Sequence, residues 1–131
     1  MTMPRRFGAY EVSRFVDGVY KAPVSHLIHR QGAEALAAAL AGHHGETVDM
    51  DVNCFTLSGP EGIWLIDAGC GTAWGEAYGH ARAAMIAAGI QPDDVSRVIL
   101  THIHGDHALG LIDGDRPYFA KAEIWVPEAD L

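Results

Sequence analysis

The sequence predicts an α/β fold, because short apolar runs typical of strands alternate with stretches typical of helices. Two strand-like runs meet at the tight turn 59–62, a helical stretch follows them, and another apolar run lies at 95–100. Small and polar residues come directly after these runs, at 66–71 and at 101–107. Since α/β proteins collect their sites at strand ends, we expect the functional residues in these two segments.

The N-terminal part predicts a hairpin and a short helix. The β-prone stretches 10–15 and 19–21 flank an Asp-Gly pair at 17–18, which is typical of a turn between two short strands. The segment 31–40, QGAEALAAAL, is rich in alanine and leucine and is followed by a glycine, which predicts a helix. We expect a loop at 43–46.

The central part predicts a strand pair, a helix and a buried strand. The run 48–57 alternates and then becomes apolar, GPEG turns the chain, and IWLI returns at 63–66. The stretch 76–88 places alanines and a methionine on one stripe and ends at a glycine, as a helix would. Val95 to Leu100 then forms a strand, with the histidine-rich segment as its C-terminal loop.

The last part predicts a turn, a short strand and the start of a helix. The turn lies around 114–117, the strand at 123–126, and Pro127 with Glu128 opens a helix. We expect the three tryptophans to lie in the core.

Composition and charge exclude several classes of protein. Hydrophobic residues make up 49% and charged residues 20%, so the chain is too apolar to be disordered. The net charge of −8 argues against a nucleic acid or an anionic membrane as partner. No run approaches the roughly 18 apolar residues of a membrane span. With no apolar signal segment behind Met1, we expect a cytoplasmic protein in which Cys54 and Cys70 are reduced.

The segment THIHGDH, 101–107, has the ligand types and spacing of a metal site. His102 and His104 are two apart in an extended stretch, so they project to one side and can share an ion. Gly105 lets the backbone turn, so that Asp106 and His107 can face a second ion. Two ions about 3.5 to 4 Å apart would hold a bridging water and deprotonate it near neutral pH. Such a pattern has a chance expectation of about 0.002, which favours this interpretation over a solvated loop.

THIHGDH resembles the metal-binding signature of the metallo-β-lactamase fold hydrolases. NCFTLSGPEGIWLIDAGCG is similar to the strand pair of that family, which ends in an Asp-x-Gly loop, and AGIQPDDVSRVILTHIHGDHALGL is similar to the next unit. The tail GDRPYFAKAEIWVPEADL resembles the branch that contains methyl parathion hydrolase and related lactonases. This resemblance implies an αββα sandwich, in which two sheets lie back to back with helices outside.

The resemblance also implies roles for single residues. His102 and His104 would hold the first metal, and Asp106 and His107 would hold the second. Asp106 would be the catalytic carboxylate, which orients the metal-bound hydroxide and takes up a proton. Asp67 matches the aspartate of the Asp-x-Gly loop and would support that loop, although an aspartate that only caps a strand-end turn explains it equally well.

Residues outside the motif are expected to be structural. We expect His26, His29, His43 and His44 to lie at the surface or in packing contacts rather than on a metal, and we do not favour Cys70 as a ligand.

The predicted site is incomplete. Members of this branch are much longer, and the second half supplies a third histidine, a bridging aspartate and a final histidine. Here no histidine follows His107, and the chain ends at Leu131. We therefore expect 1–131 to be one partial domain, the N-terminal half of the sandwich, whether truncated, split or completed by another chain.

The function expected by resemblance is metal-dependent hydrolysis of an ester, lactone or phosphotriester. The motif begins at His102, after an extra hairpin, helix and loop, which favours the lactonase and organophosphate-hydrolase branch over glyoxalase II. The cofactor would be two divalent ions, zinc first, with manganese, iron and cobalt as alternatives. The partners would be a small-molecule substrate, and a second copy or a complementing C-terminal half. The alternative is an inactive fragment or a non-catalytic interaction module that keeps the motif.

Overall fold

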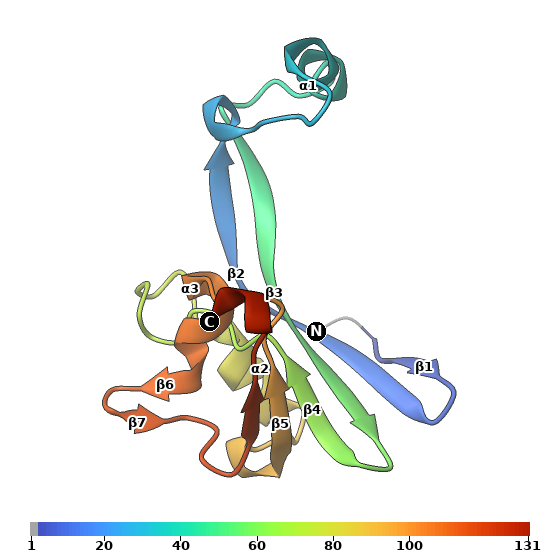
Figure 1. Cartoon of the computed structure of the whole chain (residues 1–131), viewed down its shortest axis with the longest axis vertical. Helices are drawn as coiled ribbons and strands as arrows, with labels where there is room; N and C mark the ends of the chain where they lie inside the picture. Colours follow the sequence, from blue (N-terminus) through green and yellow to red (C-terminus); the bar gives the residue numbers. More distant parts are fainter. Residues whose placement is uncertain (1–2) are drawn as a thin grey trace. The chain divides into compact units, whose positions relative to one another are not determined.

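Six strands form the main sheet of the computed structural model, which describes residues 3–131 (Figure 1). Their order in the sheet is β1-β2-β3-β4-β5-β8. A second, two-stranded sheet pairs β6 with β7. The strands are β1 (Arg5–Phe7), β2 (Tyr10–Pro23), β3 (Thr47–Gly59), β4 (Gly62–Ile66), β5 (Val95–Ile99), β6 (Ile112–Asp113), β7 (Arg116–Pro117) and β8 (Glu123–Trp125).

The helices are short and lie between the strands. They are α1 (Ala33–Ala39), α2 (His80–Ala87) and α3 (Gly105–Ala108), with the 3-10 turns η1 (Val24–His26), η2 (Pro92–Asp94), η3 (Leu109–Leu111) and η4 (Glu128–Asp130). Among residues 3–131, none of the helices has the length and apolar character needed to cross a membrane.

The expected α/β class is confirmed, since the chain combines a six-stranded sheet with helices between the strands.

The chain divides into two compact units. The main unit consists of the described residues up to Gly18 together with Asp51–Leu131, and the second unit is Val19–Met50. The main unit holds the mixed part of the sheet, in which β3 and β4 are antiparallel and β4, β5 and β8 are parallel. Because parallel strands end at the same edge, the segments that follow β4 and β5 come together there.

One face of the sheet in the main unit carries the apolar core. Ala81 and Met85 of α2 belong to the same buried cluster as Leu65 of β4 and Val98 of β5, and the last two are paired in register. Complete burial of a side chain such as Leu65 or Val98 contributes roughly 1.5–3 kcal/mol to the free energy of unfolding. Phe15 is also part of the cluster, so β2 is anchored to this face.

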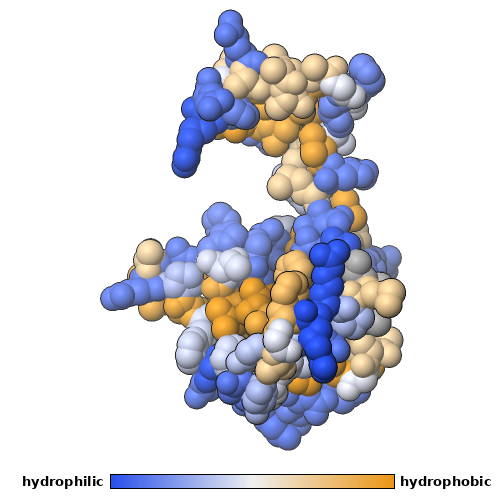
Figure 2. All heavy atoms as spheres, turned by 90° about the vertical axis from the view of Figure 1, so that its right-hand side faces the viewer, coloured by the Kyte–Doolittle hydropathy of each residue, from blue (hydrophilic) through white to orange (hydrophobic). Residues whose placement is uncertain are grey.

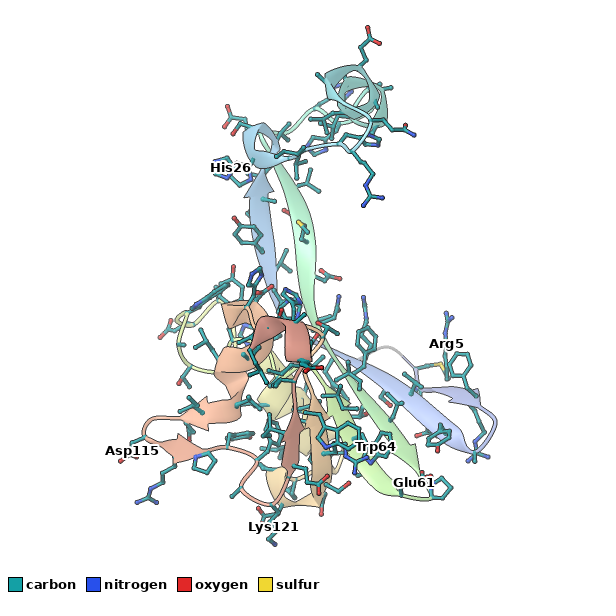
Figure 3. All side chains as sticks on the ribbon, viewed as in Figure 1. Arg5, His26, Glu61, Trp64, Asp115 and Lys121 are labelled. Carbon is teal, nitrogen blue, oxygen red and sulfur yellow. The ribbon has the colours of Figure 1, made fainter. Side chains whose placement is uncertain are left out.

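The other face of the sheet in the main unit is more open. Trp64, Arg97 and Glu123 are cross-strand neighbours on it, and the Arg97 guanidinium stacks on the Trp64 and Trp125 rings, at 4.5 and 3.9 Å from their centroids. Trp64 is labelled in Figure 3, and Figure 2 shows that apolar side chains reach the surface of the molecule. The expectation that the tryptophans lie in the core is wrong for Trp74 and Trp125, which are 43% and 49% exposed.

The predicted turn at 17–18 is wrong. β2 runs without interruption from Tyr10 to Pro23. Asp17 is completely buried and accepts three backbone hydrogen bonds, and a Cβ at Gly18 would overlap the ring of Tyr78. The pair therefore serves close packing, and the hairpin lies earlier, between β1 and β2, where Gly8 has a φ of 61°.

The other predicted elements are confirmed with shifted ends, except that the helix expected to open at Pro127 is the 3-10 turn η4. The strand pair around 59–62 is β3 and β4, and the strands at 95–100 and 123–126 are β5 and β8. The helix predicted over 76–88 begins only at His80, because the preceding Gly79 has a φ of 83°. The histidine segment is not entirely a loop, since α3 occupies its second half.

Candidate metal centre

The site lies at the carboxyl end of β4 and β5. Ile66 and Ile99 are paired in register, and the N–H of Asp67 donates to the carbonyl of Ile99 at 3.0 Å. The loop that starts with Asp67 therefore lies beside the segment that starts with Thr101. The sequence predicted functional residues in these two segments, and the topology brings them together.

Asp67 links the two segments. Its Oδ1 accepts hydrogen bonds from the N–H and the hydroxyl of Thr101, at 2.8 and 3.1 Å, and its Oδ2 lies 2.8 Å from Nδ1 of His107. The side chain is nearly buried, and Asp67 is the only non-glycine among the described residues with a positive φ, at 57°. An aspartate tolerates this conformation better than most residues. Asp67 thus caps the turn and also holds His107.

His102 and His104 point their ring nitrogens at each other. Nε2 of His102 lies 3.1 Å from Nδ1 of His104, and the ring centroids are 4.5 Å apart. On its other side, Nδ1 of His102 lies 3.1 Å from the hydroxyl oxygen of Thr101. That hydroxyl donates its one proton to Asp67, so it accepts from His102, whose Nε2 then carries the lone pair.

His107 and Asp106 form a second pair beside the first. Nε2 of His107 lies 3.1 Å from Oδ2 of Asp106. Nδ1 of His107 donates to Asp67, so in the neutral ring the lone pair of Nε2 faces Asp106 and is available to a cation, whereas in the protonated ring Nε2 donates to Asp106. The rings of His102 and His107 are 4.1 Å apart between centroids, so the two pairs are neighbours.

The donor atoms fit divalent zinc in type and spacing. Each pair brings two potential ligand atoms to 3.1 Å, a distance at which either a shared proton or a cation can lie between them. Zinc bonds of about 2.0–2.1 Å place two tetrahedral ligand atoms roughly 3.3 Å apart, close to the 3.1 Å found in each pair. Imidazole nitrogen and carboxylate oxygen are both preferred ligands of zinc.

Each pair is short of a complete site. Among residues 3–131, no group of three or more His, Cys, Asp or Glu side chains is arranged to hold one ion. Structural zinc sites use four protein ligands and catalytic ones use three. The described residues therefore present two neighbouring donor pairs, which we call the first half-site (His102 and His104) and the second half-site (Asp106 and His107).

Backbone hydrogen bonds fix the motif on both sides. The N–H of Ala68 donates to the carbonyl of His107, and the N–H of Gly110 donates to the carbonyl of Gly69, both at 2.8 Å. A Cβ at Gly110 would overlap the carbonyl oxygen of Ala68, so only glycine permits this approach. Oδ2 of Asp130 accepts the N–H of Ile103 at 2.8 Å.

Cys70 lies in the loop after Asp67 and is completely buried. Burial, with the nearby carboxylates of Asp17 and Asp106, raises the pKa of Cys70 to about 12, so the thiol keeps its proton at neutral pH. Burial also raises the pKa of Cys54. The thiolate is the form that binds metal, so a metal ion at Cys70 would first have to displace this proton.

Two supporting residues were missed from the sequence. Asp17 was interpreted as part of a turn, and Arg82 was only one residue of a predicted helix. Arg82 is 8% exposed and donates to the carbonyls of Gly110 and Ile112 at 3.0 and 2.6 Å, so it holds the segment that follows α3. In the sequence, both residues could be noticed only as charged residues within apolar stretches. Asp17, for example, lies two positions after Phe15.

The histidines of the second unit lie at or near its surface, as expected. His26, His43 and His44 are exposed; Figure 3 labels His26. His29 is half-buried, and its Nδ1 accepts a hydrogen bond from the N–H of Gln31 at 3.1 Å.

Comparison with known proteins gives a family and several fold relatives. Residues 47–123 match the family described as the metallo-beta-lactamase superfamily. Over 52 residues, 40% of this chain, the sequence is 42% identical to ribonuclease Z of Methanothermobacter thermautotrophicus, of which those residues are 14%.

Two solved structures share the fold over nearly the whole chain. The hydrolase AbOPH of the beta lactamase superfamily matches with a TM-score of 0.82 and 23% identity, over 97% of this chain and 44% of that one. AidC, a dizinc quorum-quenching lactonase in complex with a homoserine product, matches with a TM-score of 0.85 and 23% identity, over 98% of this chain and 45% of that one. The chain thus spans less than half the length of these proteins.

Proposed function

Since the chain belongs to the metallo-β-lactamase superfamily, we propose that it forms the N-terminal half of a metal-dependent hydrolase that cleaves an ester, a lactone or a phosphotriester. The observation that carries the proposal is the convergence of two donor pairs at one strand end, His102 with His104 and Asp106 with His107. Their atom types and spacing suit two neighbouring divalent ions, with zinc proposed first and manganese, iron or cobalt as alternatives.

The residues of this chain have separate tasks in the proposed reaction. His102 and His104 hold the first ion and His107 the second, with Asp67 keeping the His107 ring in one orientation. When bound, the ions supply Lewis-acid polarisation of the reacting bond and lower the pKa of water. Asp106, one-third exposed in its side chain, accepts a proton from the attacking water and returns it to the leaving group.

A small organic substrate is supported by charge and by fold. The net charge of −8 disfavours a polyanionic nucleic acid, although a short segment is similar to ribonuclease Z. The lactonase AidC shares the fold and was solved with a small product, which supports a substrate of that size. We assign the chain to the lactonase and organophosphate-hydrolase branch on this basis.

A second candidate is a non-catalytic module that keeps the motif. The observation in its favour is that each ion would receive only two ligands from the described residues. A complementing segment, from the same or another chain, would have to supply the rest. The two candidates differ in whether turnover appears once that segment is present.

The test is hydrolysis of a panel of lactone, aryl ester and phosphotriester substrates, with and without EDTA. The 131-residue chain alone is expected to match free metal in buffer, whereas the chain joined to a complementing half is expected to show EDTA-sensitive turnover. Turnover by the 131-residue chain alone would contradict the half-site interpretation, and none by either form would favour the non-catalytic module.

In the complemented protein, Asp106→Asn should lower kcat at least about 100-fold, because an amide accepts no proton. The matched control is Asp115→Asn, the same change at a side chain that is 98% exposed and labelled in Figure 3. It should leave kcat unchanged. Equal kcat values for the two variants would refute the role of Asp106.

A further inference from the structure

Asp17 carries a buried carboxylate in the middle of β2. The residue is 0% exposed. Its Oδ2 accepts the N–H of Cys70 at 2.8 Å and of Gly79 at 3.1 Å, and its Oδ1 accepts the N–H of Ala81 at 3.2 Å. Gly79 and Ala81 lie at the N-terminus of α2, where the helix dipole favours a negative charge. The carboxylate therefore replaces its lost water with three charge-assisted hydrogen bonds.

These hydrogen bonds join segments that are distant in sequence. Cys70 belongs to the loop after β4, while Gly79 and Ala81 begin α2, so one side chain ties a strand, a loop and a helix together. The contact is close, because a Cβ at Gly69 would overlap the carboxylate of Asp17. Gly69 has a φ of 73°, which also favours glycine there.

The same loop holds α3 from its other side. Asp67 binds the ring of His107, Ala68 donates to the carbonyl of His107, and Gly69 accepts from Gly110. A shift of the loop would thus move both the ring and the backbone of His107. His102 reaches this loop only indirectly, through the Thr101 hydroxyl that binds Asp67, and His104 has no hydrogen bond to 67–70 among those found in the described residues, so both depend less on the position of the loop than His107 does.

We propose that Asp17 is a positioning residue for the second half-site, which fixes the loop 67–70 so that His107 presents its Nε2 beside Asp106 to a divalent cation. This inference rests on the proposed function for the identity of the ligand. The carboxylate is required because all three surrounding groups are donors, and an amide would turn its own N–H₂ toward at least one of them. Residues that orient a ligand typically change metal affinity about 10- to 100-fold when they are altered.

The experiment is a zinc titration of the full 131-residue chain, followed by NMR on the histidine rings, since each ring reports on its own ion. Asp17→Asn is compared with Asp51→Asn, the same change on the neighbouring strand at a side chain that is 43% exposed. Met85→Ala, a core change in α2, serves as a variant of lowered stability that leaves the hydrogen-bonding groups of Asp17 in place.

The expected result is selective. In Asp17→Asn the zinc dissociation constant at His107 should rise about 10- to 100-fold, and that at His102 should change less than about threefold. Asp51→Asn and Met85→Ala should leave both constants near those of the unaltered chain. Unchanged binding at His107 in Asp17→Asn would overturn the proposal, and so would an equal loss at both histidines, which would indicate a merely structural role.

A readout without metal separates this proposal from the proposed function. In the unaltered chain the Nδ1 proton of His107, shared with Asp67, should give a ring N–H signal protected from exchange, and Asp17→Asn should lose it. That result would support positioning even if zinc failed to bind, and retention of the signal would overturn it. If Asp17→Asn does not fold, amide exchange of the unaltered chain decides: protection of the Cys70 N–H supports the proposal, and free exchange overturns it.

Discussion

Histidines gather in two regions of this molecule, and among residues 3–131 only one of these regions has side chains that hold the histidine rings. The second unit, Val19–Met50, carries His26, His29, His43 and His44. Of its residues, all of which the structure describes, only Ala22 is buried. In the main unit, the histidines of the motif follow a buried strand and are held by carboxylates and backbone groups from two other segments.

The difference shows that spacing alone does not make a ligand set. His43 and His44 are adjacent and exposed, and no side-chain partner fixes the free nitrogen of either ring toward a common point in the structure described for residues 3–131. In the motif, Thr101 and Asp67 bind the Nδ1 atoms of His102 and His107, so that the opposite nitrogens face inward. Preorganisation of this kind separates a metal site from a histidine-rich surface.

The largest difference between the two units is expected in how much a core substitution lowers the free energy of unfolding. Leu65→Ala, in the completely buried core of the main unit, should lower the free energy of unfolding by about 2–5 kcal/mol. Leu36→Ala, the same change in α1, where no residue is buried, should alter the main unfolding transition by less than about 0.5 kcal/mol. Chemical denaturation of both variants measures this. Similar losses would mean that the second unit belongs to the cooperative core.

A second difference is expected in metal binding. His102→Ala should weaken zinc binding at the first half-site by more than about 100-fold, because it removes one of only two donors. His43→Ala should leave the affinity unchanged, since we expect that residue at the surface rather than on a metal, and it is exposed. Isothermal titration calorimetry on both variants gives the comparison. An equal loss from His43→Ala would show that the ligands are misassigned.

The smallest effect concerns the alkaline pH dependence of stability. The pKa of Cys70 is raised from the ordinary value of 9.0 to about 12, so between these values the folded chain keeps a proton that the unfolded chain has lost. Stability is therefore unaffected by this group below pH 9 and falls as the pH rises toward 12, by about 1.4 kcal/mol per pH unit.

Replacement of the thiol should flatten this decline. Urea unfolding of the unaltered chain and of Cys70→Ala at pH 7.5 and about 10.5 tests it, with a residual slope left by Cys54, whose pKa is also raised. Parallel pH profiles would contradict the assignment of the alkaline decline to Cys70.

Local patterns in the sequence were sufficient for much of the fold and for the place of the histidine motif at a strand end. The strand pair β3–β4 follows from alternation around a tight turn, and the motif follows from ligand types at a strand end. The role of Asp17 could not be predicted, because its three partners are 53 to 64 residues away. From the local sequence alone, an Asp-Gly pair predicts a turn. Only contacts with distant segments place this pair inside a strand.

The central claim is that the strand end after β5 holds two divalent ions side by side. The most direct test is an anomalous difference map, recorded at the zinc edge, from crystals of the chain grown with zinc. We predict two peaks about 3.5 to 4 Å apart, one beside His102 and His104 and the other beside Asp106 and His107. Peaks only at His26, His29, His43 or His44, or no peak at the strand end, would contradict it.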